Sequence, residues 1–280
     1  MGTPDRRTAR FAAVAAGFLL FACGQTPASH PAPAGSSATP EVDSAAQLAT
    51  TLATAEAGIR SPATSEARIA SLARAQQLAY LKLADHADWL DTVLERVPAE
   101  LRTAVRNNYD AMAGIAVLNP PLSSPPSWHL VPAPPADQLR SFYLEAEQAS
   151  GVPWQYLAAI HFIETSFSRI DSDSTAGAQG PMQFIPSTWA EYGQGDIHST
   201  HDAVLGAARY LKASGAPSDM ARAVLAYNPD DRYVTAVSAY AANMIADERA
   251  FLGYYHWRVY VVTRTGPVFL DPASTTGSGG

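Results

Sequence analysis

The sequence is poor in cysteine and in charge. It has one cysteine, Cys23, in 280 residues. A disulfide framework needs pairs of cysteines and a thiolate zinc cluster needs several, so both are excluded. Charged residues make up only 16%, and 19 Lys+Arg against 26 Asp+Glu give a net charge of −7. Nucleic-acid-binding proteins usually present a basic surface, so no nucleic-acid partner is expected.

Other familiar signatures are also missing. No apolar run of 18 or more residues follows the N-terminal segment, so no internal membrane span is expected. The chain contains no G-x-S-x-G, phosphate-binding loop or H-E-x-x-H motif, and we expect neither a cofactor nor a bound metal. What the chain does have is 47% hydrophobic residues with abundant alanine, which favours a packed, mainly α fold.

The N-terminus has the pattern of an export signal. Arg6, Arg7 and Arg10 precede an apolar stretch at 11–22 that is too short to span a bilayer. The run Leu-Phe-Ala-Cys-Gly at 20–24 resembles a bacterial lipobox, in which the cysteine is acylated and becomes the mature N-terminus. We predict a lipoprotein signal peptide at 1–22, lipidation at Cys23, and a protein exported and anchored at the outer face of the cell membrane or in the cell envelope. An ordinary signal peptide and twin-arginine export remain alternatives.

Composition divides the rest of the chain into segments. A Pro/Ala/Ser tether at 23–41 precedes a helical region at 42–118, where apolar residues recur every three or four positions. Seven prolines fall in the eighteen residues 119–136, which predicts a semi-rigid linker. A catalytic domain is expected at 137–262 and a tail at 263–280. The helical region reads as two or three antiparallel helices without identifiable chemistry, and a cell-wall protein partner for it is left open.

The most informative carboxylate is Glu164. Pro153 suits the start of a helix running to about Phe167. On that helix one apolar face is shared by Leu157, Ile160, Glu164 and Phe167. Burial without a cationic partner raises the pKa of a carboxyl group, which is what a general acid for glycosidic cleavage requires. From periodicity alone, a glutamate that turns into water at the helix end is the alternative.

Three motifs follow in order. Glu-Thr-Ser-Phe at 164–167 precedes Gly-Ala-Gln-Gly-Pro-Met-Gln-Phe at 177–184, and Ala-Tyr-Asn occupies 226–228. This combination resembles the lysozyme-like lytic transglycosylases of the bacterial cell wall, most closely their membrane-bound B-type and soluble-lytic branches. Thr165 stands where serine is usual but keeps the hydroxyl, and Pro181 replaces a frequent leucine or isoleucine. The resemblance covers roughly residues 140 to 260.

The resemblance implies a fold and an activity. The fold would be mainly α, with a lysozyme-like catalytic domain preceded by the helical region. The activity would be cleavage of the β-1,4 bond between N-acetylmuramic acid and N-acetylglucosamine, with Glu164 as acid and then base, forming 1,6-anhydromuramoyl ends. The tyrosine hydroxyl of Tyr227 would reach the substrate or Glu164. Substrate contacts would come from Ser166, Ser174, Met182, Gln183, Phe184, Tyr227, Asn228 and Tyr240.

Aromatic side chains are a further source of substrate contacts. Sugar-stacking walls could come from two of six aromatic residues: Phe167, Phe184, Trp189, Tyr192, Tyr233 and Tyr240.

Several alternatives stay open at this point. A hydrolytic muramidase would need a second carboxylate, for which Asp171 and Asp173 are candidates. An inactive peptidoglycan-binding lipoprotein is a third possibility. The loop beginning at Asp171 starts like a calcium loop but lacks the required Gly and Glu, and His198 with His201 is a weak zinc candidate.

Overall fold

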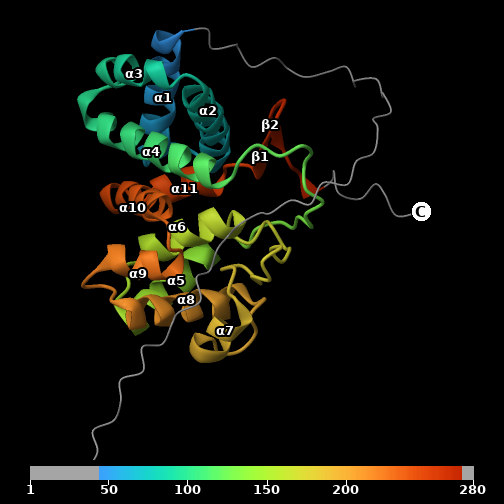
Figure 1. The fold of residues 1–280 in the computed structure, drawn as a ribbon. Helices are drawn as coiled ribbons and strands as arrows, with labels where there is room; N and C mark the ends of the chain where they lie inside the picture. The colour runs from blue at the N-terminus through green and yellow to red at the C-terminus, as the bar shows by residue number, and fades with distance from the viewer. Residues whose placement is uncertain (1–43, 273–280) are drawn as a thin grey trace, which may run out of the picture.

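The computed structural model of the chain describes residues 44–272. Over these residues the chain forms eleven α-helices, two short 3₁₀ helices and one two-stranded hairpin (Figure 1), so the expectation of a mainly α fold is confirmed. The expected signal peptide, Cys23 and the tether at 23–41 lie outside the described residues. No helix between residues 44 and 272 is long and apolar enough to cross a membrane.

The helical region contains four α-helices, more than the two or three expected. They are α1 (Ala45–Arg60), α2 (Glu66–Asp85), α3 (Leu90–Arg96) and α4 (Arg102–Leu118), with 3₁₀ turns at Ala87–Trp89 and Ala99–Leu101. Ser44 caps α1 by accepting a hydrogen bond from the Gln47 amide at 3.3 Å. Pro62 and Pro98 lie in the breaks between helices, where a missing amide hydrogen costs nothing.

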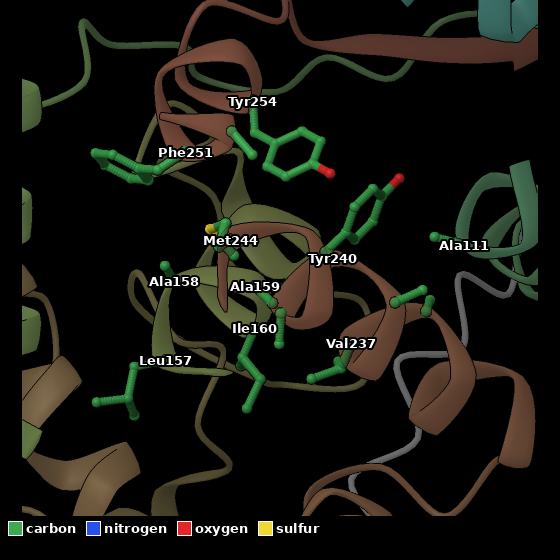
Figure 2. Close-up of a cluster of buried hydrophobic side chains, with 14 of the residues drawn as sticks. Ala111, Leu157, Ala158, Ala159, Ile160, Val237, Tyr240, Met244, Phe251 and Tyr254 are labelled. Carbon is green, nitrogen blue, oxygen red and sulfur yellow. The ribbon is translucent and has the colours of Figure 1, made fainter. Parts of the chain in front are cut away.

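The second half of the chain is built around α6. Its helices are α5 (Ala136–Ser150), α6 (Trp154–Thr165), α7 (Pro186–Tyr192), α8 (Thr200–Ser214), α9 (Met220–Tyr227), α10 (Asp231–Ala246) and α11 (Ala250–Tyr255). Figure 2 shows α6 residues from Leu157 to Ile160 beside Val237 and Met244 of α10, with Phe251 of α11 nearby. These side chains are at most 2% exposed, so the helix that ends in Glu164 is fixed by a close-packed core.

The two halves share one core. Helix α4 lies along α10 (Figure 1), and Gly114 of α4 approaches so closely that a Cβ there would be 3.1 Å from the Arg232 carbonyl oxygen. The buried Asn108 side chain of α4 also accepts hydrogen bonds from the Tyr254 hydroxyl at 2.6 Å and the Asn243 amide at 3.0 Å. The helical region is therefore docked on the second half of the chain through apolar and buried polar contacts.

The proline-rich segment is hydrogen-bonded to the second half of the chain. Leu122 donates to the Val262 carbonyl at 2.9 Å and accepts from the Arg264 amide at 3.0 Å. Those two residues belong to the hairpin formed by β1 (Tyr260–Thr263) and β2 (Gly266–Phe269), which pair antiparallel. The expected boundary between 262 and 263 thus falls inside β1, because a strand had gone unrecognised. Prolines have no amide hydrogen to donate, so the hydrogen bonds that hold this segment come from the residues between the prolines.

Candidate active site

Glu164 occupies the last turn of α6. Leu157, Ile160 and Phe167 of the predicted face are fully buried, whereas Glu164 itself is half-buried and lines a cavity of about 230 Å³. Pro153 is the N-cap residue just outside the helix, and the helix ends at Thr165, two residues earlier than expected. The carboxyl group is therefore held by a packed helix at the edge of a cavity, whereas the periodicity predicts only that it shares a helix face with apolar residues.

Burial controls the electrostatics of Glu164. It raises the pKa of this carboxyl from 4.5 to about 7, against the opposing effect of a hydrogen bond that the Tyr233 hydroxyl donates to Oε1 at 2.5 Å. No ion pair among the described residues includes Glu164. The guanidinium of the nearby Arg169 is directed instead to the carbonyls of Ser166 and Tyr255. Glu164 thus keeps a large protonated fraction at neutral pH.

The backbone directly after α6 is strained. Ser166, Phe167 and Ser168 have φ of 51°, 63° and 65°, three consecutive non-glycine residues in the left-handed region. Such conformations cost about 1–3 kcal/mol each and persist where the surrounding structure enforces them. Here Thr165 enforces them, because its hydroxyl accepts from the Ser168 amide at 3.1 Å and donates to the Pro181 carbonyl at 2.7 Å. The hydroxyl that Thr165 shares with serine therefore joins the first motif to the second.

His161 supports the same turn from inside the core. It is fully buried, with Nδ1 2.7 Å from the Tyr143 hydroxyl and Nε2 2.8 Å from the Ser168 hydroxyl. Burial, with a smaller contribution from the positive charge of Arg169, lowers the pKa of His161 to about 3, so the imidazole is neutral. Sequence reasoning did not single out this residue. Its position three residues before Glu164 on an apolar helix was the available signal.

The second motif forms a tight loop that depends on glycine. Gly180 has φ of 70°, and a Cβ there would lie 2.0 Å from the Ile197 carbonyl oxygen, so no other residue fits. Gln183 also has positive φ, 48°, and its side-chain amide donates to the Gly180 carbonyl at 2.9 Å. The Met182 carbonyl accepts from the Tyr227 hydroxyl at 2.5 Å. The second and third motifs are thereby tied together.

The cavity brings some of the predicted residues together and leaves others out. Ser166, Ser174, Gln183 and Tyr240 line it with Glu164. Four others are buried and are not part of its lining: Met182, Phe184, Tyr227 and Asn228. The hydroxyl of Tyr227, expected at Glu164 or the substrate, donates to Met182 instead.

The site differs from the sequence prediction in the role of Tyr233 and in the segments that line the cavity. Of the six aromatic candidates for stacking, only Tyr240 lines the cavity, and Tyr233 instead hydrogen-bonds the Glu164 carboxyl. Their spacing of seven on α10, two helical turns, was a signal that both face α6. Fourteen of the twenty-four lining residues lie before α5 or after α10, in α2, α4, the proline-rich segment and the chain around β1.

The candidate metal positions have other partners. Asp171 lies 3.1 Å from the His129 imidazole, and Asp173 accepts from the Gln179 amide at 3.3 Å. His201 contacts Glu145 and its neighbour Asp202. Between residues 44 and 272, no three His, Cys, Asp or Glu side chains are grouped to hold a metal ion.

Known proteins match the second half of the chain. Residues 141–248 match the family model described as "Transglycosylase SLT domain". The chain carries a transglycosylase SLT domain. The match begins inside α5, ends just before α11 and contains all three motifs. A protein of Thiobacillus denitrificans named membrane-bound lytic murein transglycosylase F is 36% identical over 73 residues, which cover 26% of this chain and 15% of that relative. No solved structure matches the chain.

Proposed function

We propose that this protein is a peptidoglycan lytic transglycosylase that cleaves the β-1,4 bond between N-acetylmuramic acid and N-acetylglucosamine. The observation that carries the proposal is Glu164: a half-buried glutamate, with a carboxyl pKa of about 7, that lies within the SLT match and lines a cavity shared with residues outside that match. A general acid works best when its pKa lies near the working pH. The Thiobacillus denitrificans relative supports the reaction class through its name.

The reaction needs only one carboxyl group. Protonated Glu164 gives its proton to the glycosidic oxygen as the bond to C1 of the muramoyl residue breaks and positive charge develops on that ring. The resulting carboxylate then takes the proton of the C6 hydroxyl while O6 bonds to C1, which closes a 1,6-anhydro ring and restores the acid. The internal hydroxyl replaces water as the nucleophile at high effective concentration.

The residues around Glu164 would bind and orient the sugars. Ser166, Ser174 and Gln183 supply hydrogen-bonding groups in the cavity lining, and Tyr240 supplies an aromatic face. The Tyr233 hydroxyl would hold the Glu164 carboxyl in one orientation through both proton transfers. In place of the substrate contacts that the resemblance implies, the loops would be fixed by four buried residues: Met182, Phe184, Tyr227 and Asn228.

The test is product analysis with a matched pair of variants. The exported protein should release muropeptides with anhydro ends from isolated peptidoglycan, read by mass spectrometry. Glu164→Gln should lower the rate by about 10²–10⁴-fold, because an amide cannot deliver the proton. Glu191→Gln, an exposed glutamate on α7 outside the cavity lining, is the control and should keep full activity. Residual activity of Glu164→Gln above a tenth of wild type would contradict the proposal.

A hydrolytic muramidase is the second candidate, because one observation favours it. Asp173 lines the same cavity as Glu164 and could activate a water molecule. The products would then carry reducing ends instead of anhydro ends. An inactive peptidoglycan-binding lipoprotein, the third alternative, would release no product at all, so the one digestion separates the three.

The proposed location is the cell envelope, with a lipid anchor at Cys23. This proposal rests on the sequence pattern at 20–24. It is tested by the mass of the N-terminal peptide from the membrane fraction, and an unmodified Cys23 there would contradict it. A cell-wall protein partner of the helical region also remains a proposal.

A further inference from the structure

The proline-rich segment forms a fixed wall of the active-site cavity. Beyond the hydrogen bonds of Leu122 to the hairpin, its far end is pinned by the Asp171 amide, which donates to the His129 carbonyl at 2.9 Å, and by the Val131 amide, which donates to the Arg169 carbonyl at 3.0 Å. Both anchor points lie on the chain that leaves the Glu164 helix. With prolines restricting the backbone between the anchors, the segment is preorganised.

Trp128 is the aromatic side chain that this wall places in the cavity. It is half-buried and lines the same cavity as Glu164. The next residue, His129, donates its amide hydrogen to the Ser172 hydroxyl at 2.9 Å. Ser172 and Asp173 are themselves part of the lining. The indole ring of Trp128 therefore lines the cavity together with the Ser172 hydroxyl and the Asp173 carboxylate, and both of these groups can hydrogen-bond a ligand.

The chemistry of the cavity is divided between its two sources. The SLT domain contributes most of the polar groups, whereas the segments outside it contribute mainly apolar side chains, such as Ile115, Leu122 and Val262. The only charged residue from those outside segments is Arg258, and its guanidinium Nε is bound to Asp271 at 3.1 Å. Such a wall has little to offer a carboxylate-rich peptide. It suits an uncharged ring with one apolar face and polar edges.

We propose that Trp128 forms a saccharide-binding subsite for the glycan strand, supplied by the chain outside the SLT domain. The proposal deepens the proposed function and rests on it for the identity of the strand. One N-acetylated sugar ring would stack its C–H face on Trp128 while its hydroxyl and acetamido groups bond to Ser172 and Asp173. The subsite adds affinity without touching the proton transfers of Glu164.

Binding can be measured apart from catalysis. In the Glu164→Gln protein, calorimetry with the pentamer of N-acetylglucosamine should give a dissociation constant. Adding Trp128→Ala should weaken it about tenfold, the size of one good aromatic contact. Trp128→Phe should restore most of the affinity, whereas Trp128→Leu, which keeps apolar bulk without a ring, should not. Trp89→Ala is the control, because Trp89 stacks on His86 in the helical region and is not in the cavity lining.

The outcomes separate the subsite from the reaction. In the otherwise wild-type enzyme, Trp128→Ala should raise KM about tenfold, leave kcat within twofold and leave the pH profile unmoved. Equal pentamer binding by the Trp128→Ala and parent proteins, or no measurable binding by the parent, would overturn the subsite whatever products form. An effect confined to glycan that bears peptide stems would overturn it too, in favour of a peptide contact. If Trp128 increases the affinity for the pentamer but the wild-type enzyme forms no anhydro product, only the proposed function would be overturned.

Discussion

Two glutamates embedded in this protein have opposite surroundings. Glu56 of α1 is fully buried, and its Oε1 accepts from the side-chain amides of Gln76 at 2.8 Å and Asn108 at 2.9 Å, and from the Tyr80 hydroxyl. Its other oxygen pairs with the Arg60 guanidinium. Glu164 is half-buried, and its carboxyl accepts one hydrogen bond, from the Tyr233 hydroxyl. No Lys, Arg or His among the described residues forms an ion pair with it.

The difference separates a structural carboxylate from the proposed catalytic one. A buried carboxylate that is fully paired contributes to one fixed arrangement, here the junction where Asn108 links Glu56 to α10 and α11. A carboxyl group left under-bonded is costly to ionise, and this cost is what raises the pKa of Glu164. Burial alone therefore does not raise the pKa of a carboxyl group to the value that a general acid needs; at Glu164 the shortage of hydrogen-bonding and cationic partners adds to it.

The largest expected effect is at the structural glutamate. Glu56→Gln should destabilise the protein by about 3–5 kcal/mol, because it leaves the Arg60 guanidinium largely buried without its counter-charge. Thermal unfolding should show a fall in Tm of about 10 °C. The control is Glu95→Gln, an exposed glutamate of α3 that forms no ion pair with another described residue, and this change should alter Tm by less than 2 °C. Equal Tm values for the two variants would remove the contrast with Glu164.

The opposite sign is expected at Glu164. Its pKa is about 7 in the folded protein against 4.5 ordinarily, so as pH rises from 4.5 to 7 the unfolded chain loses its proton first and stability falls; above 7 the penalty is constant. Glu164→Gln removes the penalty and still accepts the Tyr233 hydrogen bond. Its Tm should exceed that of wild type by about 2–6 °C at pH 8 and by nothing at pH 4. A Tm gain independent of pH would place the cause elsewhere.

The hydrogen bond of Tyr233 gives a third, smaller effect. It lowers the pKa of Glu164, so Tyr233→Phe should raise that pKa further. The general acid must be protonated, and activity should therefore decline at a pH about one unit higher than in wild type. The pH dependence of kcat/KM measures the shift. Tyr227→Phe, whose hydroxyl serves the Met182 carbonyl, is the matched control and should leave the decline in place.

The sequence predicted the parts of the site that depend on local pattern. Helical periodicity placed Glu164 on the apolar face of its helix, and the glycines of the second motif marked a loop in which Gly180 has no room for a side chain. These features are decided by residues within a few positions of one another. The same holds for the mainly α fold, which follows from repeated apolar spacing.

The rest depends on contacts between distant segments. Proline content predicted a semi-rigid linker at 119–136 but could not reveal that Leu122 joins the hairpin or that Trp128 lines the cavity. The hairpin itself had a readable signal: β-branched residues lie on either side of a turn at 264–265, which is followed by Gly266 with φ of 116°. Tyr233 was named only as a wall, because seven-residue spacing identifies a shared face but not the partner opposite it.

The smallest expected effect concerns the second acidic group in the cavity lining. Asp173 shares that lining with Glu164, whereas Asp171 contacts His129 and is not part of it, so the two form a matched pair. A hydrolase that uses Asp173 as its base should lose activity by orders of magnitude in Asp173→Asn. A transglycosylase uses its substrate's own C6 hydroxyl and does not need the base.

We therefore expect Asp173→Asn and Asp171→Asn each to keep at least about a fifth of wild-type activity, with anhydro ends in all products by mass spectrometry. Any small loss at Asp173 would reflect sugar contacts. A hundredfold loss at Asp173 alone, in a folded protein whose wild type releases reducing ends, would make Glu164 one of two catalytic carboxyls and the enzyme a muramidase.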